Sequence, residues 1–234
     1  DGRDPAYTVA HSACHAARNA LGASGAALTL DGGMIPMQNW YAPSLLPSTG
    51  AGLQQWAPME MAQMLQTGAS TRGSAAGPMA QVVLHSTQYL RPVDIAAMAQ
   101  YLGALPDETG AQVALGIAAG DSGAASEEGA KLYEKHCAQC HGAAGQGIVG
   151  AYAALAGSRA VTRDSPVNLV QMVLNGGFPP ATQGNPRPFG MPPFALILSD
   201  HDVAAVLSHV RNSWGNRASD VAAHDVDLLR GNAR

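Results

Sequence analysis

The chain of 234 residues is 47% hydrophobic but only 13% charged, about half of the roughly 25% that is usual for a soluble domain. Its net charge of −4, with 13 basic against 17 acidic residues, excludes charge-driven disorder and leaves no basic surplus for binding nucleic acid. No stretch reaches about 18 uninterrupted apolar residues, so the sequence predicts no membrane-spanning helix.

The first expected element is a short helix that ends at Cys14-His15, within His11-Ser12-Ala13-Cys14-His15. On its own, a Cys-His pair carries almost no information, and a buried thiol beside an incidental histidine is then the favoured interpretation. The chain has three cysteines, and an odd number cannot form a fully paired disulfide framework. The interpretation of this pair therefore depends on the rest of the sequence.

An irregular, Gly-rich stretch follows and leads to a helix that ends at Gly68. A proline-flanked methionine, Pro78-Met79, comes next, in an expected loop. The first half ends with an amphipathic helix, since four of its apolar residues recur at helical spacing: Ile95, Met98, Ala99 and Leu102.

Residues 103–129 are rich in Gly, Ala, Ser and acidic residues, with Pro106 near the start, which is typical of a connection between domains. The sequence therefore predicts one domain at 1–105, a linker at 106–125 and a second domain at 126–234.

The second domain begins with a helix capped at Ser126 that leads into Cys137-Ala138-Gln139-Cys140-His141. This C-x-x-C-H pattern is the attachment sequence of a c-type haem. Two thiols one helical turn apart add to the two vinyl groups of the haem, and the adjacent histidine is directed at the iron. A zinc site would need a second pair of ligands, and a thioredoxin-type redox pair would lie beside a βαβ pattern. The sequence offers neither.

A second proline-flanked methionine, Met191, lies in Phe189-Gly190-Met191-Pro192-Pro193-Phe194. The prolines hold the loop extended, so it can present the thioether inward. The last predicted helix is capped by Ser199, with Asp202 at its third position. Its apolar face consists of Val203, Val206, Leu207 and Val210.

The same order of elements therefore occurs twice, which indicates an internal duplication. Gln63-Met64-Leu65-Gln66-Thr67-Gly68 is similar to Gln171-Met172-Val173-Leu174-Asn175-Gly176. His11 stands where the second copy has its first attachment cysteine. The first copy is longer after its histidine, and we assign the extra residues to the loop around 32–44, which carries Trp40.

Two axial ligands are expected on a haem that transfers electrons, and a neutral thioether raises the reduction potential. The order of elements places Met191 opposite His141 and Met79 opposite His15. Other residues of the first half remain as alternatives to Met79: Met34, Met37, Met59, Met61, Met64, Met98 and His85. Met61 and Met64 fit the core of a helix better than a ligand position.

Segments in both halves carry a family resemblance: Cys14-His15 with Arg18-Asn19, Trp40-Tyr41-Ala42-Pro43-Ser44, Gly77-Pro78-Met79-Ala80 with His85-Ser86-Thr87, Cys137 to Gly142, Gly190-Met191-Pro192-Pro193-Phe194, and Val210-Arg211-Asn212-Ser213-Trp214-Gly215-Asn216. They resemble the multi-haem cytochrome c subunits of periplasmic, membrane-bound dehydrogenase complexes, of the quinoprotein alcohol dehydrogenase or molybdenum aldehyde dehydrogenase type. Those subunits usually have three haem domains, and the chain is similar to the last two.

The resemblance implies the axial pairs His15 with Met79 and His141 with Met191, and covalent attachment through Cys14, Cys137 and Cys140. The implied partner is a catalytic dehydrogenase subunit, a quinoprotein or a molybdenum hydroxylase, with a small third subunit and with quinone or cytochrome oxidase as the electron acceptor. The implied location is periplasmic, with the inner membrane reached through the complex.

We therefore predict an all-α protein of two tandem class I cytochrome c domains with two covalently bound haem c groups. It is expected to transfer electrons and to catalyse no reaction itself. The alternatives are a free-standing di-haem carrier of the cytochrome c4 type and a di-haem peroxidase with one open iron. Residues 1–105 contain no lysine and only nine charged residues, so we expect a partner to cover this half.

Overall fold

The structure is a computed structural model that describes residues 11–19, 22–23, 30–35, 37–46, 53–105 and 127–231. The chain divides into two units. The first comprises Asp1–Ser70, Gly77–Val113 and Pro180–Pro186, and the second comprises Thr71–Ala76, Ala114–Pro179 and Arg187–Arg234. The expected linker at 106–125 and the expected cap at Ser126 lie outside the described residues, and the expected domain boundaries stay a prediction.

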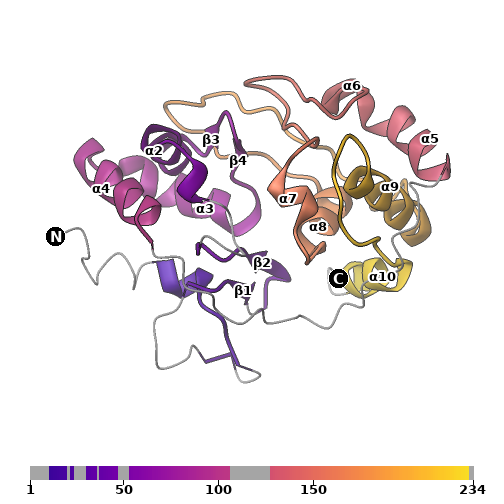
Figure 1. Ribbon diagram of the computed structural model, residues 1–234, viewed down its shortest axis with the longest axis horizontal. Coiled ribbons are helices and arrows are strands. Elements are labelled where there is room, and N and C mark those ends of the chain that lie inside the picture. The colour runs from indigo at the N-terminus through magenta and orange to yellow at the C-terminus, as the bar shows by residue number, and fades with distance from the viewer. Residues whose placement is uncertain are drawn as a thin grey trace. The chain divides into compact units, whose positions relative to one another are not determined.

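The first unit has a helical turn at residues 11–15 and short elements around three longer helices (Figure 1). In chain order these are β1 (Gly33–Ile35), β2 (Trp40–Ala42), the 3-10 helix η1 (Leu53–Gln55), α2 (Pro58–Thr67), β3 (Ala69–Ser70), α3 (Gly77–His85), the 3-10 helix η2 (Thr87–Tyr89) and α4 (Pro92–Gly103). Helix α2 starts with Pro58, where the missing N–H costs nothing. It ends at Gly68 in the left-handed conformation (φ 74°), as predicted.

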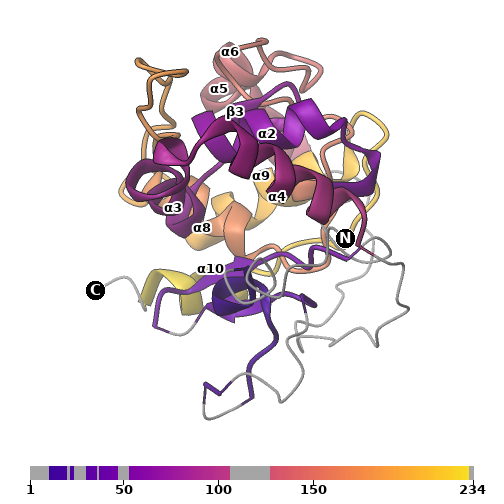
Figure 2. The ribbon, with the colours of Figure 1, turned by 90° about the vertical axis from the view of Figure 1, so that its left-hand side faces the viewer.

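The core of this unit forms where α2 packs against α4, which lie side by side in both views (Figure 1 and Figure 2). The predicted apolar face of α4 is confirmed, because all four of its residues are buried. Met61 and Leu65 of α2 pack against it, together with Leu30, Leu45 and Leu53. The prediction that Met61 belongs to the core is therefore right.

A hairpin of β1 and β2 was not expected from the sequence. The strands pair antiparallel with Gly33 opposite Ala42 and Ile35 opposite Trp40. Met37 and Asn39 lie between them in the left-handed region, at φ 64° and 54°. Asn tolerates this conformation better than most residues, so Asn39 is the one local signal of the turn. The strands are only three residues long, too short for an alternating pattern to stand out.

The second unit contains the strand β4 (Gly73–Ser74) and six helices within its described residues. These helices are α5 (Glu127–His136), α6 (Ala138–His141), α7 (Arg159–Thr162), α8 (Val167–Asn175), α9 (Asp200–Asn212) and α10 (Ala223–Gly231). The described part of the chain is thus predominantly helical, with strands of two or three residues. None of its helices has the length and apolar character needed to cross a bilayer.

Helix α9 begins as the sequence predicts. The Ser199 hydroxyl accepts a hydrogen bond from the N–H of Asp202 at 3.2 Å, and the Asp202 carboxylate accepts one from the N–H of Ser199 at 2.9 Å. Satisfying both backbone donors stabilises the first turn. The four predicted apolar residues of α9 are all buried. Helix α5 crosses α9 closely at Gly129, where a Cβ would lie 2.3 Å from the carbonyl oxygen of Ala205.

Arg211, in the last turn of α9, is completely buried, which its presence in the resemblance did not reveal. Its Nη1 donates to the carbonyls of Val161 and Arg163, both at 2.8 Å. Its Nε donates to the carbonyl of Ser219 at 2.7 Å. Because the guanidinium holds its donors in a rigid fork, one side chain joins α7 to the segment before α10.

Replacing Arg211 should therefore unfold the second unit more easily. Arg211→Leu leaves three carbonyls without their donor, and we expect the free energy of unfolding to fall by about 3 kcal/mol or more. Urea denaturation followed by circular dichroism measures this. Arg217→Leu, at an exposed arginine of the same region, is the matched control and should change stability by less than about 0.5 kcal/mol. Equal effects of the two variants would contradict the role assigned to Arg211.

Candidate functional site

The C-x-x-C-H segment forms a single helical turn that almost continues α5. The N–H of Cys137 donates to the carbonyl of Tyr133 and the N–H of His141 to that of Cys137, both at 2.9 Å. Cys137, Cys140 and His141 are therefore brought together, and both thiols are free and partly exposed. Burial, and secondarily the neighbouring Cys140, raises the pKa of Cys137 to about 11, so this thiol is protonated at neutral pH in the haem-free chain.

The His141 ring is oriented by a backbone carbonyl. Its Nδ1 lies 2.8 Å from the carbonyl oxygen of Ala153, 12 residues later. Since a carbonyl only accepts hydrogen bonds, the ring carries its hydrogen on Nδ1 and its lone pair on Nε2. That tautomer makes Nε2 the metal-binding atom, and the hydrogen bond fixes the direction in which it points.

Gly147 allows the loop after His141 to close this tightly. Its N–H donates to the carbonyl of His141 at 2.7 Å, and it adopts φ 65°. A Cβ at this position would lie 2.5 Å from the Tyr152 oxygen and 2.7 Å from the carbonyl carbon of Ala153. Those contacts are with backbone, which has no room to move. Only glycine therefore lets the Ala153 carbonyl reach the His141 ring.

Three aromatic side chains pack beside this loop. The Tyr133 hydroxyl donates to the carbonyl of Gly142 at 2.7 Å, and its ring centroid lies 4.9 Å from that of Trp214. The Trp214 ring covers Gly145, where a Cβ would come within 2.5 Å of it. Burial raises the pKa of Tyr133 to about 12 and lowers the pKa of His209, whose ring contacts both. The cluster thus stays neutral near pH 7.

Met191 lies in an extended segment clamped to the end of α8. Its N–H donates to the carbonyl of Gly177 at 2.8 Å and its carbonyl accepts from the N–H of Gly177 at 3.0 Å. Gly176, at φ 63°, approaches so closely that a Cβ there would lie 2.3 Å from the Met191 oxygen. This backbone pairing agrees with the expected extended loop.

The first unit repeats the same geometry around His15. Its Nδ1 lies 2.7 Å from the carbonyl oxygen of Pro43, 28 residues later. Gly32, at φ 77°, donates its N–H to the carbonyl of His15 at 2.7 Å. A Cβ at Gly32 would lie 2.6 Å from the Ala42 oxygen and 2.7 Å from the Pro43 carbonyl carbon. The sequence reasoning missed both carbonyls and both glycines, because a backbone acceptor leaves no side-chain signal.

The matching glycines correct the position of the extra residues in the first copy. Gly147 follows His141 closely, whereas Gly32 comes long after His15. Most of the extra residues therefore precede Gly32 rather than lying around 32–44, and the remainder forms the β1–β2 hairpin. Arg18 secures the start of this longer path by donating to the carbonyls of Gly22 and Ala13.

Met79 lies in the first turn of α3, not in the loop that the sequence predicted. Gly77 starts this helix at φ 53°, and the run Gly77–His85 contains enough helix-forming residues to continue it past Pro78. The Met79 side chain is half-buried and packs against the core of the first unit. Cys14 and His15 belong to the helical turn at 11–15.

The exposure of each side chain reduces the number of residues that could be the iron ligand in place of Met79. Met37 and Met59 are 100% and 81% exposed, which does not suit a ligand enclosed beside a haem. Met61 and Met98 are buried in the core between α2 and α4. His85 is exposed at the end of α3, where its ring contacts Gln81. Met34 and Met64, both half-buried, remain.

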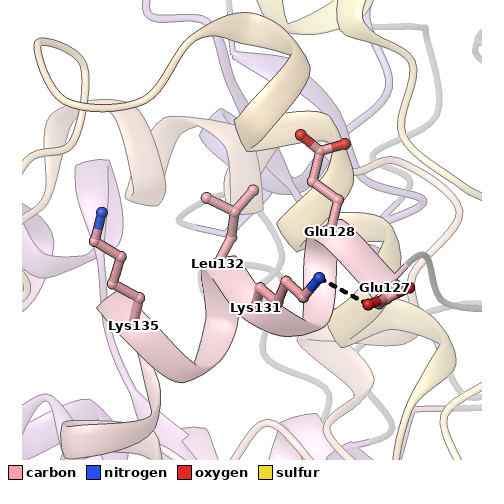
Figure 3. Close-up of a pocket in the computed structure, with 5 residues that line it drawn as sticks. All are labelled: Glu127, Glu128, Lys131, Leu132 and Lys135. Atoms are coloured by element: carbon pink, nitrogen blue, oxygen red, sulfur yellow. Dashed lines mark ion pairs between the residues drawn. The ribbon is translucent and has the colours of Figure 1, made fainter.

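A hollow of about 500 Å³ lies along the exposed side of α5. Glu127, Glu128, Lys131, Leu132 and Lys135 line it, and all come from this one helix (Figure 3). Lys131 pairs with Glu127 at 2.7 Å, an ordinary contact between successive helical turns. The hollow contains none of the predicted ligands and is a solvated helix surface.

Glu128, His201 and Asp202 offer ligand atoms within 4.8 Å of one another. Asp202, however, already accepts a hydrogen bond in the cap of α9, and His201 lies 3.8 Å from the carboxylate of Glu128. The cap of α9 and the contact between His201 and Glu128 account for the cluster, so we assign it no metal.

The role of Gly147 in closing the loop after His141 can be tested with two matched variants. Gly147→Ala and Gly157→Ala both place a Cβ on left-handed backbone, but only Gly147 meets other atoms, since nothing lies within 4 Å of Gly157. We expect Gly147→Ala to lower the free energy of unfolding by about 1–3 kcal/mol more than Gly157→Ala. Urea denaturation of the two variants measures the difference, and equal losses would show that the loop is not tightly closed.

Comparison with known proteins gives a consistent result. The family model described as cytochrome c matches residues 126–214. The chain is 36% identical, over 93% of its length, to the alcohol dehydrogenase (quinone) cytochrome c subunit of Gluconacetobacter polyoxogenes, and 35% identical, over 93%, to the gluconate 2-dehydrogenase cytochrome c subunit of Pantoea cypripedii. It spans about half the length of these relatives, 49% and 52%.

A shorter relative matches one part of the chain. Cytochrome c-552 of Thermus thermophilus is 36% identical over 38% of the chain, and the match covers 70% of that protein. The matched range of the family model includes Cys137, Cys140 and His141, whose geometry is described above. The chain therefore belongs to the cytochrome c family and is similar to the cytochrome c subunits of dehydrogenases.

Proposed function

We propose that this chain is an electron-transfer subunit that holds two covalently bound haem c groups, one in each unit. The observation that carries the proposal is the recurrence of one geometry: a histidine whose Nδ1 meets a backbone carbonyl, beside a left-handed glycine that meets the same stretch of backbone. The second unit has this geometry next to a complete attachment sequence. Its recurrence at His15 supports a second, tandem class I cytochrome c domain.

In the second unit, the residues present fit a haem. Cys137 and Cys140 are free thiols one turn apart and would form the two thioether bonds. His141 would bind the iron through Nε2, since its Nδ1 is engaged with Ala153. Met191 would supply the second ligand through its sulfur. Bound haem supplies a one-electron iron couple, and the protein sets its potential and access.

In the first unit, Cys14 would form a single thioether bond, since His11 supplies no thiol at the other attachment position. His15 would bind the iron through Nε2 and Met79 through its sulfur. With one covalent bond fewer, this site depends more on the packing of its loops. The hydrogen bond from His15 to Pro43 supplies part of that order.

The ligand set favours an electron carrier over an enzyme. If a histidine and a methionine bind each iron, no coordination position would be open to a small substrate, which would argue against the di-haem peroxidase alternative. The hydrogen bond at Nδ1 also makes Nε2 a stronger donor, because it places partial negative charge on the ring.

We also propose that the chain works inside a complex. The relatives are named as subunits of dehydrogenases, and the low charge of residues 1–105 supports a covered surface rather than the free-standing carrier alternative. The partner would be a catalytic dehydrogenase subunit, with a small third subunit and with quinone or a cytochrome oxidase as acceptor. Because c-type haem is attached outside the cytoplasm, we place the complex in the periplasm, at the inner membrane.

The number of haems follows from the mass of the intact, denatured chain. We expect two haem increments on the unmodified protein and one on Cys14→Ser, because Cys14 would be the only covalent anchor of the first haem. A single increment on the unmodified protein would contradict the two-haem proposal while leaving the second site in place.

Denatured haem also reports the number of thioether bonds, since an unreacted vinyl group stays conjugated with the ring and shifts the visible band to longer wavelength. The unmodified protein should show a mixture of the two band positions. Cys137→Ser converts the second site to a single anchor, so all of its haem should show the shifted band.

The methionine ligands are testable by spectroscopy of the folded ferric protein. Met79→Ala and Met191→Ala should each remove about half of the weak long-wavelength absorption that is typical of methionine-ligated haem. Met59→Ala, at an exposed methionine, should leave it unchanged. Full absorption in Met79→Ala would transfer the ligand role to one of the other half-buried methionines, Met34 or Met64.

A further inference from the structure

We propose that Trp40 and Tyr152 are positioning residues that hold the methionine-bearing segment of each unit against the loop that orients the histidine. The inference rests on the proposed function and goes beyond it, since neither side chain is a ligand. Each aromatic residue lies on the loop whose carbonyl meets the axial histidine. Each contacts the residue two positions before the axial methionine.

Trp40 makes this connection in the first unit. It lies in β2, three residues before Pro43, and its side chain is half-buried. The ring covers Gly77, because a Cβ built there would lie 2.6 Å from Cε2, 2.7 Å from Cδ2 and 2.8 Å from Cε3 of Trp40. Three nearly equal distances mean that the ring face lies over the Gly77 backbone. Met79 follows two residues later in the same turn of α3.

Tyr152 makes the corresponding connection in the second unit. It directly precedes Ala153, and its ring centroid lies 5.3 Å from that of Phe189, with the planes at 56°. Phe189 is two residues before Met191, and the ring of Phe178 covers the intervening Gly190, where a Cβ would lie 2.3 Å from Cε1. A hydrogen bond to the Cys140 thiol raises the pKa of the Tyr152 hydroxyl, so Tyr152 also contacts the attachment turn.

The two connections are built from different local structures. Trp40 belongs to a strand and covers a helical glycine, whereas Tyr152 follows a tight turn and packs on the ring of an extended segment. The partners are nevertheless at the same place relative to the methionine. The two units therefore make the same connection through different contacts.

The methionine segment needs such a contact more than the histidine does. Histidine follows directly after a covalently attached cysteine, but no covalent bond ties the methionine segment to the attachment turn. If this segment moved away, the iron of a bound haem would lose its methionine ligand and could accept an added one. The apparent affinity of that ligand rises in proportion to the fraction of chains with methionine detached.

Binding of imidazole to the full-length ferric holoprotein tests the inference. Trp40→Leu should raise the imidazole affinity of one of the two haems by about 10-fold, because the detached fraction would rise by that factor. It should also lower the reduction potential of that haem, since methionine ligation raises the potential. Trp40→Phe keeps an aromatic ring and should restore most of the unmodified behaviour.

A second variant, at Gly77, has a matched control at Gly22. Gly77→Ala displaces the Trp40 ring and should raise the imidazole affinity like Trp40→Leu, so it also answers the question if Trp40→Leu yields no folded protein. Combining the two changes should add little, because both break one contact. Gly22→Ala places a Cβ on similar left-handed backbone with nothing within 4 Å and should leave the affinity unchanged.

Variants of Tyr152 test the proposed contact in the second unit independently of those in the first. Tyr152→Leu should raise the imidazole affinity of the other haem, whereas Tyr152→Phe, which loses the hydrogen bond to Cys140 but keeps the ring, should not. If both variants raise the imidazole affinity equally, the role belongs to the hydroxyl and the proposed ring contact is overturned.

The haem content of the unmodified protein, taken with the imidazole affinities of the variants, distinguishes failure of this inference from failure of the proposed function. If it carries a single haem, the first site fails, and the role of Trp40 is overturned with it. If both haems are present with methionine ligands and neither Trp40→Leu nor Tyr152→Leu binds imidazole more tightly, the positioning role is overturned while the two-haem proposal stands.

Discussion

The hydrogen bond between a histidine ring and a backbone carbonyl is the constraint on which the rest of each unit depends. A ring held at Nδ1 offers its lone pair in one direction only. For the carbonyl to arrive there, the chain after the histidine must turn back on itself, which requires a left-handed glycine with backbone on all sides. Tyr133 and Trp214 then contact the returning chain of the second unit, at Gly142 and Gly145.

The two units reach this arrangement with different amounts of chain. In the second, 12 residues separate the ring from its carbonyl, and two thiols stand beside it. In the first, 28 residues separate them, one thiol is present, and a short hairpin delivers the carbonyl. The longer path costs more conformational entropy to order, yet it carries Trp40 to a place where it can contact the start of α3. The unit with a single thiol is thus also the unit with the longer path.

The sequence predicted what depends on side chains at regular spacing. The buried faces of α4 and α9, the cap at Ser199 and the left-handed end of α2 at Gly68 all follow from local patterns, and each is confirmed. The hairpin, the helical start at Gly77 and the terminal helix α10 were missed, because strands of three residues and a proline near a helix start carry weak local signals. The carbonyls of Pro43 and Ala153 could not be found at all, since every residue has one.

The exposure of the methionines has a consequence for their oxidation. Of the nine in the chain, Met37 and Met59 are largely exposed, and the others are buried or half-buried. In the isolated chain, these two thioethers are the most accessible to a peroxide or other oxidant in the solvent. Conversion of Met37 to its polar sulfoxide disturbs no packing, because its side chain is fully exposed. Oxidation at this position therefore leaves the packing around the buried and half-buried methionines unchanged.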